Sequence, residues 1–129
     1  MWKIGIDIPE YAILPGREFQ SKLAISNVAV ATSGDYRNYF KLNGKTYSHT
    51  INPKTGRSVT HNLASVTIIA STCMQADGIA TAAMVLGEKE SLKWIEGIPD
   101  VEVLLIVRNE DDSFSEYQSS GFGKHLAKK

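Results

Sequence analysis

Residues 63–83 constrain the fold more than any other part of the chain. Leu63–Ser71, LASVTIIAS, is an apolar and β-branched run, which is typical of a strand that is covered on both faces. Thr72 and Gln75 follow with the spacing of a capping box, so we expect a helix to begin at Cys73. A strand of this kind needs packing partners on both sides, and the following helix is the natural candidate for one of them.

The predicted helix, Cys73–Leu86, is thin, meaning that many of its side chains are small. Its axis can therefore approach a sheet closely. Gly87 is placed to end it, because glycine readily adopts the conformation of a helix C-cap. A shorter helix, Lys89–Glu96, is expected to follow and to end at Gly97. The small residues that make the first helix thin are Ala76, Gly78, Ala80, Ala82 and Ala83.

Alternation of apolar and polar residues predicts the remaining strands. Lys22–Thr32 changes phase around Asn27, which indicates a bulge or a bend there. Asn43-Gly44 lies between two strand-like runs and is a strong hairpin signal. Glu10–Ser21, which contains Pro15-Gly16, is expected to be a loop. The other predicted strands are Trp2–Ile8, Tyr39–Leu42, Thr46–Ile51, Val101–Arg108 and Ser113–Gln118.

The order of these elements favours an α+β fold over a doubly wound sheet, because strands lie both before and after one main pair of helices. The length of 129 residues suits a single domain with one core. We expect a mainly antiparallel sheet with the Cys73–Leu86 helix packed against it and a short second helix. Its strands are Lys22–Thr32, Thr46–Ile51, Leu63–Ser71 and Val101–Arg108.

Composition excludes several classes of protein. The 14 basic and 14 acidic residues cancel, so overall charge gives no case for binding nucleic acid or an anionic membrane. The single cysteine, Cys73, rules out an internal disulfide, and its apolar surroundings predict a buried, inert thiol. No stretch of the sequence resembles a signal peptide or a membrane span.

A candidate ligand-holding segment is Tyr47–Arg57, YSHTINPKTGR. Its first half alternates like a strand with two unlike faces, and Asn52-Pro53 then stops the strand. Gly56 completes a tight turn in which it is free to adopt a positive φ. A polar strand end that leads into a rigid turn is well suited to hold a ligand.

His49 is the histidine of greatest interest, since the alternation of this segment turns it inward at the polar end of the strand. It is a candidate general base or ligand-positioning donor, and equally a hydrogen-bonded structural histidine. His61 and His125 are expected to be exposed, and Lys54 and Arg57 are expected to be solvated surface residues. Ser33-Gly34-Asp35 is explained by turn chemistry, although amides at such a turn can also face a phosphate.

Asp77 and Thr81 lie four residues apart and therefore share one face of the predicted helix. A carboxylate and a hydroxyl are hard oxygen donors, which suit Mg²⁺ far better than zinc. The alternative is that Asp77 is a surface carboxylate stabilised near the helix N-terminus. The small residues Ala76, Gly78 and Ala80 beside it favour a close-packed helix face over a solvated one.

Together these pieces resemble the ApbE family, the FAD:protein FMN transferases. The similarity lies in ATSGDYRNYFKLNGKTYSHTINPKTGRSVTHNLASVTIIA and ADGIATAAMVLG, and it extends from about Val30 to Gly87. The opening WKIGIDIP is also similar to the strand that precedes this region in the family. The resemblance covers essentially the whole chain, residues 1–129, as a single domain. It corresponds to only the C-terminal part of an ApbE-like flavin transferase.

The resemblance implies a function and a set of site residues. Family members bind FAD with Mg²⁺ at its pyrophosphate, transfer FMN to a threonine or serine hydroxyl of a target flavoprotein, and release AMP. Asp77 and Thr81 fall on the metal-ligand positions, Ile51 on a position that contacts the flavin nucleotide, and His49 on the histidine proposed to act in the transfer. Many relatives carry a second aspartate where this chain has Ala80.

Two alternatives to FMN transfer stay open at this point. The same site with water in place of the protein hydroxyl would be an FAD pyrophosphatase that yields FMN and AMP. A chain without the upstream half of the site would instead fold, as a homo-oligomer or by domain exchange, and catalyse nothing. The resemblance also implies a periplasmic, cell-envelope lipoprotein, although this sequence itself contains no signal peptide.

Overall fold

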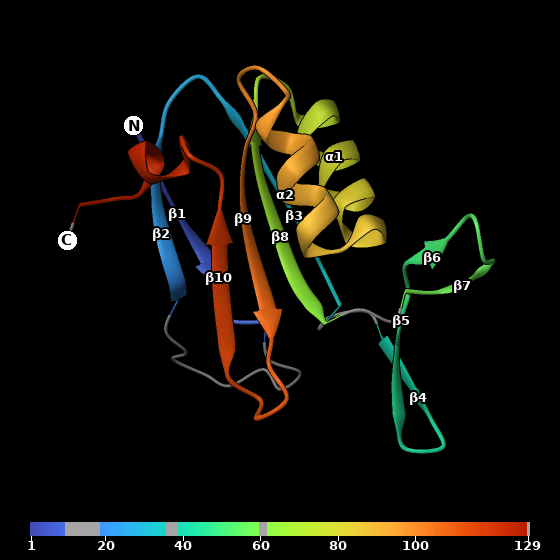
Figure 1. The fold of residues 1–129 in the computed structure, drawn as a ribbon. Helices are drawn as coiled ribbons and strands as arrows, with labels where there is room; N and C mark the ends of the chain where they lie inside the picture. Colours follow the sequence, from blue (N-terminus) through green and yellow to red (C-terminus); the bar gives the residue numbers. More distant parts are fainter. Residues whose placement is uncertain (10–18, 36–38, 60–61, 129) are drawn as a thin grey trace.

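The centre of the molecule is an antiparallel sheet of four strands in the order β10-β9-β8-β3 (Figure 1). The structure is a computed structural model that describes residues 1–9, 19–35, 39–59 and 62–128. Two helices cover one face of the sheet, and a two-stranded sheet with a short 3-10 helix covers the other (Figure 1). The central strands are β3 (Ala29–Gly34), β8 (Leu63–Ala70), β9 (Glu102–Arg108) and β10 (Phe114–Gln118). The covering elements are α1 (Cys73–Leu86), α2 (Glu88–Glu96), β1 (Trp2–Asp7), β2 (Phe19–Ile25) and η1 (Phe122–His125).

The predicted α+β class is confirmed, and so are both ends of the main helix. Thr72 lies just before α1 with extended backbone, and its hydroxyl accepts the backbone N–H of Gln75 at 3.2 Å. Gly87 has a positive φ of 86°, and its N–H donates to the carbonyl of Ala83 at 3.0 Å. The sequence signals at both ends of this helix therefore act as capping groups.

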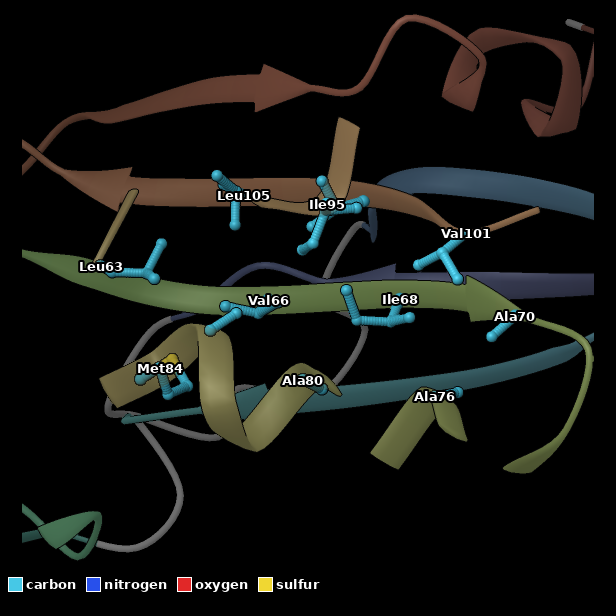
Figure 2. Packing of buried hydrophobic residues seen from close by; sticks show 12 residues of the cluster. Leu63, Val66, Ile68, Ala70, Ala76, Ala80, Met84, Ile95, Val101 and Leu105 are labelled. Carbon is cyan, nitrogen blue, oxygen red and sulfur yellow. The ribbon is translucent and has the colours of Figure 1, made fainter. Parts of the chain in front are cut away.

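The prediction that the Leu63–Ser71 run is covered on both faces is also confirmed. Every residue of β8 is buried, and its side chains alternate between two separate hydrophobic clusters. Ile68 packs on the helix side, whereas Ile69 packs on the side of β1 and β2. Figure 2 shows the helix-side cluster, whose core members include Leu63, Val66, Ile68, Ala70, Ala76, Ala80, Ala83, Met84, Ile95, Val101, Val103 and Leu105.

The contact between α1 and the sheet depends on small side chains. Ala76, Ala80 and Ala83 recur along one stripe of the helix, and all three are fully buried in the helix-side cluster. Figure 2 shows Ala76 and Ala80 on the side of α1 that faces the sheet. Cys73, in contrast, is exposed, so the prediction of a buried thiol is wrong. The reason is its position: Cys73 is the first residue of α1, and the buried stripe begins only at Ala76.

The opposite face of the sheet is packed by β1, β2 and the C-terminal segment. Phe122 is fully buried there, together with Ile6 and Leu23. Gly5 permits a close approach between the two outer strands, because a Cβ at this position would collide with the ring of Phe19. The core therefore consists of two clusters, one on each side of the central sheet.

The predicted strand Lys22–Thr32 is two strands in the structure. The chain breaks near Asn27, whose φ is 57°, so the change of phase in the sequence marks a corner between strands. β2 before this corner pairs with β1, and β3 after it pairs with β8. The expectation of a single strand within one sheet is wrong, because a left-handed residue turns the chain from one layer into the next.

The prediction that Thr46–Ile51 joins the main sheet is also wrong. The Asn43-Gly44 turn, in which both residues have positive φ, pairs β5 (Lys45–Ser48) locally with β4 (Tyr39–Leu42). A second small hairpin follows, formed by β6 (Ile51–Asn52) and β7 (Arg57–Ser58). We call residues 39–58 the arm, since they stand away from the layered body in Figure 1.

The remaining predictions concern loops and exposure. Part of the Glu10–Ser21 loop and His61 lie outside the described residues, which resume at Phe19 and Asn62. His125 is half-buried rather than exposed, and burial lowers its pKa, with Lys124 adding to the effect and Glu102 opposing it. Among the described residues, no helix is both long and apolar enough to cross a lipid bilayer.

Candidate functional site

A polar pocket of about 450 Å³ lies where four segments meet. The end of β1, the end of β3, the bend after β5 and the second and third turns of α1 each contribute residues. Three of the residues singled out from the sequence, His49, Asp77 and Thr81, line this pocket together. The full lining is Gly5, Ile6, Asp7, Thr32, Ser33, Gly34, His49, Thr50, Asp77 and Thr81.

The bend that carries His49 is held by local hydrogen bonds. Ser48 is buried, and its hydroxyl accepts the backbone N–H of Thr50 at 3.1 Å, which turns the chain out of the β5 strand. The carbonyl of Thr50 accepts the N–H of Val59 at 3.1 Å, which connects the bend to the residue just after β7. His49 is therefore exposed on a defined bend beside the pocket, and not within a strand as the alternation predicted.

Asp77 and Thr81 present oxygen atoms from one face of α1. The Thr81 hydroxyl donates its proton to the backbone carbonyl of Asp77 at 3.1 Å, so its lone pairs stay available to a cation. Both side chains are exposed where the helix borders the pocket, which fits the chemistry of a hard cation such as Mg²⁺. Ala80, in contrast, is fully buried in the contact between the helix and the sheet, and it does not line the pocket.

Asp7 is a second pocket carboxylate, which the sequence reasoning missed. It is the last residue of β1 and lines the same pocket as Asp77 and Thr81. The available signal was a lone carboxylate on the polar face of WKIGIDIP, immediately before the end of the strand. Within the part of the chain that the structure describes, no group of three or more His, Cys, Asp or Glu residues is arranged to hold a metal ion. Any cation here would therefore also require donors from water or a ligand.

The ends of β1 and β3 are fastened to each other by Arg108 at the end of β9. Its guanidinium donates to Asp35 at 3.2 Å and to the carbonyl of Pro9 at 3.0 Å. Asp35 directly follows the pocket residues Ser33 and Gly34, and its N–H donates to the carbonyl of Ala64 at 3.0 Å. This mostly buried ion pair therefore fixes the end of β3, where Ser33 and Gly34 lie in the strand and not in the turn that the sequence suggested.

Ile51 is the one predicted site residue that does not line the pocket. It begins β6 in the arm, and 52% of its surface is exposed. Ile51 is two positions beyond His49 in the sequence, but it is not among the residues that line the pocket. Its contact with a flavin nucleotide stays a prediction.

Comparison with known proteins assigns the chain to a family. The sequence profile of the ApbE family matches residues 1–105. An FAD:protein FMN transferase of Vibrio cholerae is 43% identical over 98% of this chain, and one of Haemophilus influenzae is 42% identical over 95%. The chain spans about a third of the length of these relatives, 36% and 34% respectively.

Solved structures give the same result. The flavin transferase ApbE from Vibrio cholerae superimposes with a TM-score of 0.78 at 40% identity, over 97% of this chain and 38% of that one. The ApbE protein of Thermotoga maritima also reaches 0.78, at 30% identity over 98% of this chain and 38% of that one. The fold is thus that of the flavin transferases on which this chain superimposes. The chain belongs to the ApbE family.

Proposed function

We propose that this pocket carries out Mg²⁺-dependent transfer of FMN from FAD to a threonine or serine hydroxyl of a target flavoprotein, with release of AMP. The observation that carries the proposal is the meeting of His49, Asp77 and Thr81 in one polar pocket, although they come from separate segments. The names of the family relatives support the coarser part of the proposal, transfer of FMN from FAD to a protein. This chain matches only about a third of the length of these relatives. The activity is therefore proposed for a complete site that contains these residues, and not for this chain alone.

The transfer breaks the phosphoanhydride bond of the FAD pyrophosphate and forms a phosphoester bond to the acceptor hydroxyl. The acceptor oxygen forms a bond to the phosphorus on the FMN side of the pyrophosphate, and the bond from that phosphorus to the bridging oxygen breaks. AMP leaves with the bridging oxygen and its electron pair. The proton of the acceptor hydroxyl passes to a neutral His49, which the bend after β5 holds at the pocket.

The other pocket residues bind and position the substrate. Asp77 and Thr81 would hold the cation, and Mg²⁺ when bound neutralises charge on the pyrophosphate oxygens. Ser33 and Gly34, held by the ion pair of Arg108 with Asp35, provide a rigid polar wall for phosphate oxygens. Phosphoryl transfer depends mainly on such positioning and charge neutralisation, and this pocket offers both.

The proposed reaction is tested by AMP release with and without an acceptor protein. We expect AMP to appear together with a covalent flavin on the acceptor, which mass spectrometry detects as an added FMN. The assay should be run on this chain and on the same chain joined to the upstream part of the Vibrio cholerae relative, since that relative is the longer protein. AMP release that does not depend on an acceptor would instead identify an FAD pyrophosphatase.

Self-association of this chain without catalysis is the second alternative that its sequence leaves open. Zero formal net charge does little to oppose association, and a homo-oligomer or domain exchange would cover exposed strand edges. We therefore expect light scattering of this chain to give a mass above that of one chain, rising with concentration. A monodisperse monomer at high concentration contradicts this expectation. Absence of FAD binding in an associated chain would favour the catalytically inactive alternative.

A further inference from the structure

The arm, residues 39–58, has a charge that the rest of the chain does not share. Residues 39–58 contain four Lys or Arg residues and no Asp or Glu. Because the whole chain has 14 basic and 14 acidic residues, the remainder carries a net negative charge. Positive charge is thus concentrated in and around one projecting part of the molecule (Figure 1).

The described cations of the arm face solvent and have no ion-pair partners. Lys41, Lys54 and Arg57 are all exposed, and within the described residues no ion pair involves their side chains. Two exposed aliphatic side chains, Leu42 and Ile51, lie on the same arm with 56% and 52% of their surfaces exposed. Such a surface offers apolar contact together with charge complementarity to an acidic protein.

The arm also borders the pocket. His49 and Thr50, which line the pocket, lie in the middle of the arm between its two hairpins. The pocket itself contains the carboxylates of Asp7 and Asp77, so the two regions carry opposite charges and attract different ligands. A macromolecule that presents a hydroxyl to His49 therefore approaches the segment of the chain that carries these exposed cations.

We propose that the arm is a docking surface for an acidic segment of the acceptor protein, close to the hydroxyl that receives FMN. This inference rests on the proposed function, because only transfer to a protein requires a protein at the pocket. Charge complementarity defines the partner: Asp and Glu side chains of the acceptor pair with Lys41, Lys54 and Arg57. The arm would thereby set which acceptors are used and how fast they bind.

The experiment measures binding of a labelled synthetic peptide by fluorescence anisotropy, in the absence of FAD. The peptide has a central threonine flanked by Asp and Glu, and a matched peptide carries Asn and Gln instead. We expect this chain to bind the acidic peptide preferentially. Binding should weaken as salt is raised, since the screening length falls to about 10 Å at 0.1 M ionic strength.

Matched variants locate the binding surface. The arm variant combines Lys41→Glu, Lys54→Glu and Arg57→Glu, and a milder variant replaces the same residues with Gln. The control variant combines Lys89→Glu, Lys93→Glu and Lys128→Glu, which are exposed cations outside the arm. We expect roughly tenfold weaker peptide binding for the arm variant, a smaller loss for the Gln variant, and little change for the control. Circular dichroism verifies that each variant is folded.

Each other outcome overturns the proposal. Equal binding of the acidic and neutral peptides, or equal losses in the arm and control variants, would show that the arm does not select acidic segments. Loss of FAD affinity in the arm variant would assign its charges to the nucleotide. Arm-dependent binding to phosphatidylglycerol vesicles, with no peptide binding, would assign them to a membrane. Because the peptide assay contains no FAD, failure of the transferase reaction would be detected separately, in the AMP assay.

Discussion

Replacing His49 with alanine is expected to lower the rate of FMN transfer by roughly 10²–10⁴-fold and to leave FAD affinity nearly unchanged. A general base acts mainly in the transition state, when the acceptor hydroxyl loses its proton, so its removal affects rate far more than ground-state binding. His49 is placed for this role because the bend after β5 holds it at the pocket that Asp77 and Thr81 also line. The measurement is single-turnover transfer together with a separate FAD titration.

Two further variants make the His49 result specific. His49→Gln keeps a polar side chain of similar reach but cannot take up the proton at neutral pH, so it should be nearly as slow as the alanine variant. His125→Gln changes a histidine that lies outside the pocket, and its transfer rate should match that of the unmodified protein. Equal losses of binding and rate in His49→Ala would instead identify His49 as a residue that shapes the pocket.

The sequence predicted the elements whose signals are local. The capping residue Thr72, the C-terminal Gly87 and the Asn43-Gly44 turn act through bonds to residues only a few positions away, and all three are found as expected. The burial of β8 on both faces was also predictable, because a continuous apolar run leaves no face suited to water. These local features fix α1, and with it the shared face of Asp77 and Thr81.

Long-range pairing could not be predicted from the same signals. The apolar alternation of Lys22–Thr32 is compatible with either neighbouring sheet, and only the folded chain assigns its two halves to different layers. Asp7 was missed for the same reason, since its place in the pocket depends on how the end of β1 lies against β3 and α1. Sequence reasoning thus found the candidate site residues that lie on α1 and the β5 bend, but not the carboxylate contributed by β1.

The arm shows how a correct local signal can give a wrong global placement. Thr46–Ile51 has the alternation of a sheet strand, but the tight turn before it provides a nearer partner in β4. Ser48 then bends the chain by accepting the N–H of Thr50, which ends the strand before Ile51. Consequently His49 reaches the pocket from a bend, and Ile51 is left on an exposed hairpin.

Replacing Asp77 with alanine or asparagine is expected to remove the mutual strengthening of Mg²⁺ and FAD binding. Asp77 and Thr81 supply few donors, so Mg²⁺ alone should bind weakly, and pyrophosphate oxygens and retained waters should complete about six positions. Thermodynamic linkage then requires Mg²⁺ to tighten FAD binding by the same factor by which FAD tightens Mg²⁺ binding, roughly 5–150-fold for typical couplings. Without the Asp77 carboxylate, the two ligands should bind independently.

The buried position of Ala80 sharpens this expectation. Because Ala80 packs in the core and does not line the pocket, the α1 donors reduce to Asp77 and Thr81. Thr81→Ala should weaken the coupling, whereas Thr81→Ser should preserve it, since serine keeps the oxygen whose proton is donated to the Asp77 carbonyl. Asp100→Asn is the matched charge control: Asp100 is exposed, and its φ of 59° is one that asparagine adopts readily.

Calorimetric titration of FAD with and without Mg²⁺ measures the coupling directly in each variant. The unmodified protein and Asp100→Asn should both show tighter FAD binding with Mg²⁺, and Asp77→Asn should show equal affinity in the two conditions. If Asp77→Asn retains the full effect of Mg²⁺, the metal is held elsewhere, and Asp7 is then the pocket carboxylate to replace next. If FAD binds the unmodified protein equally well with and without Mg²⁺, Asp77 is not a metal ligand, because a cation bridging the helix and the pyrophosphate must couple the two ligands.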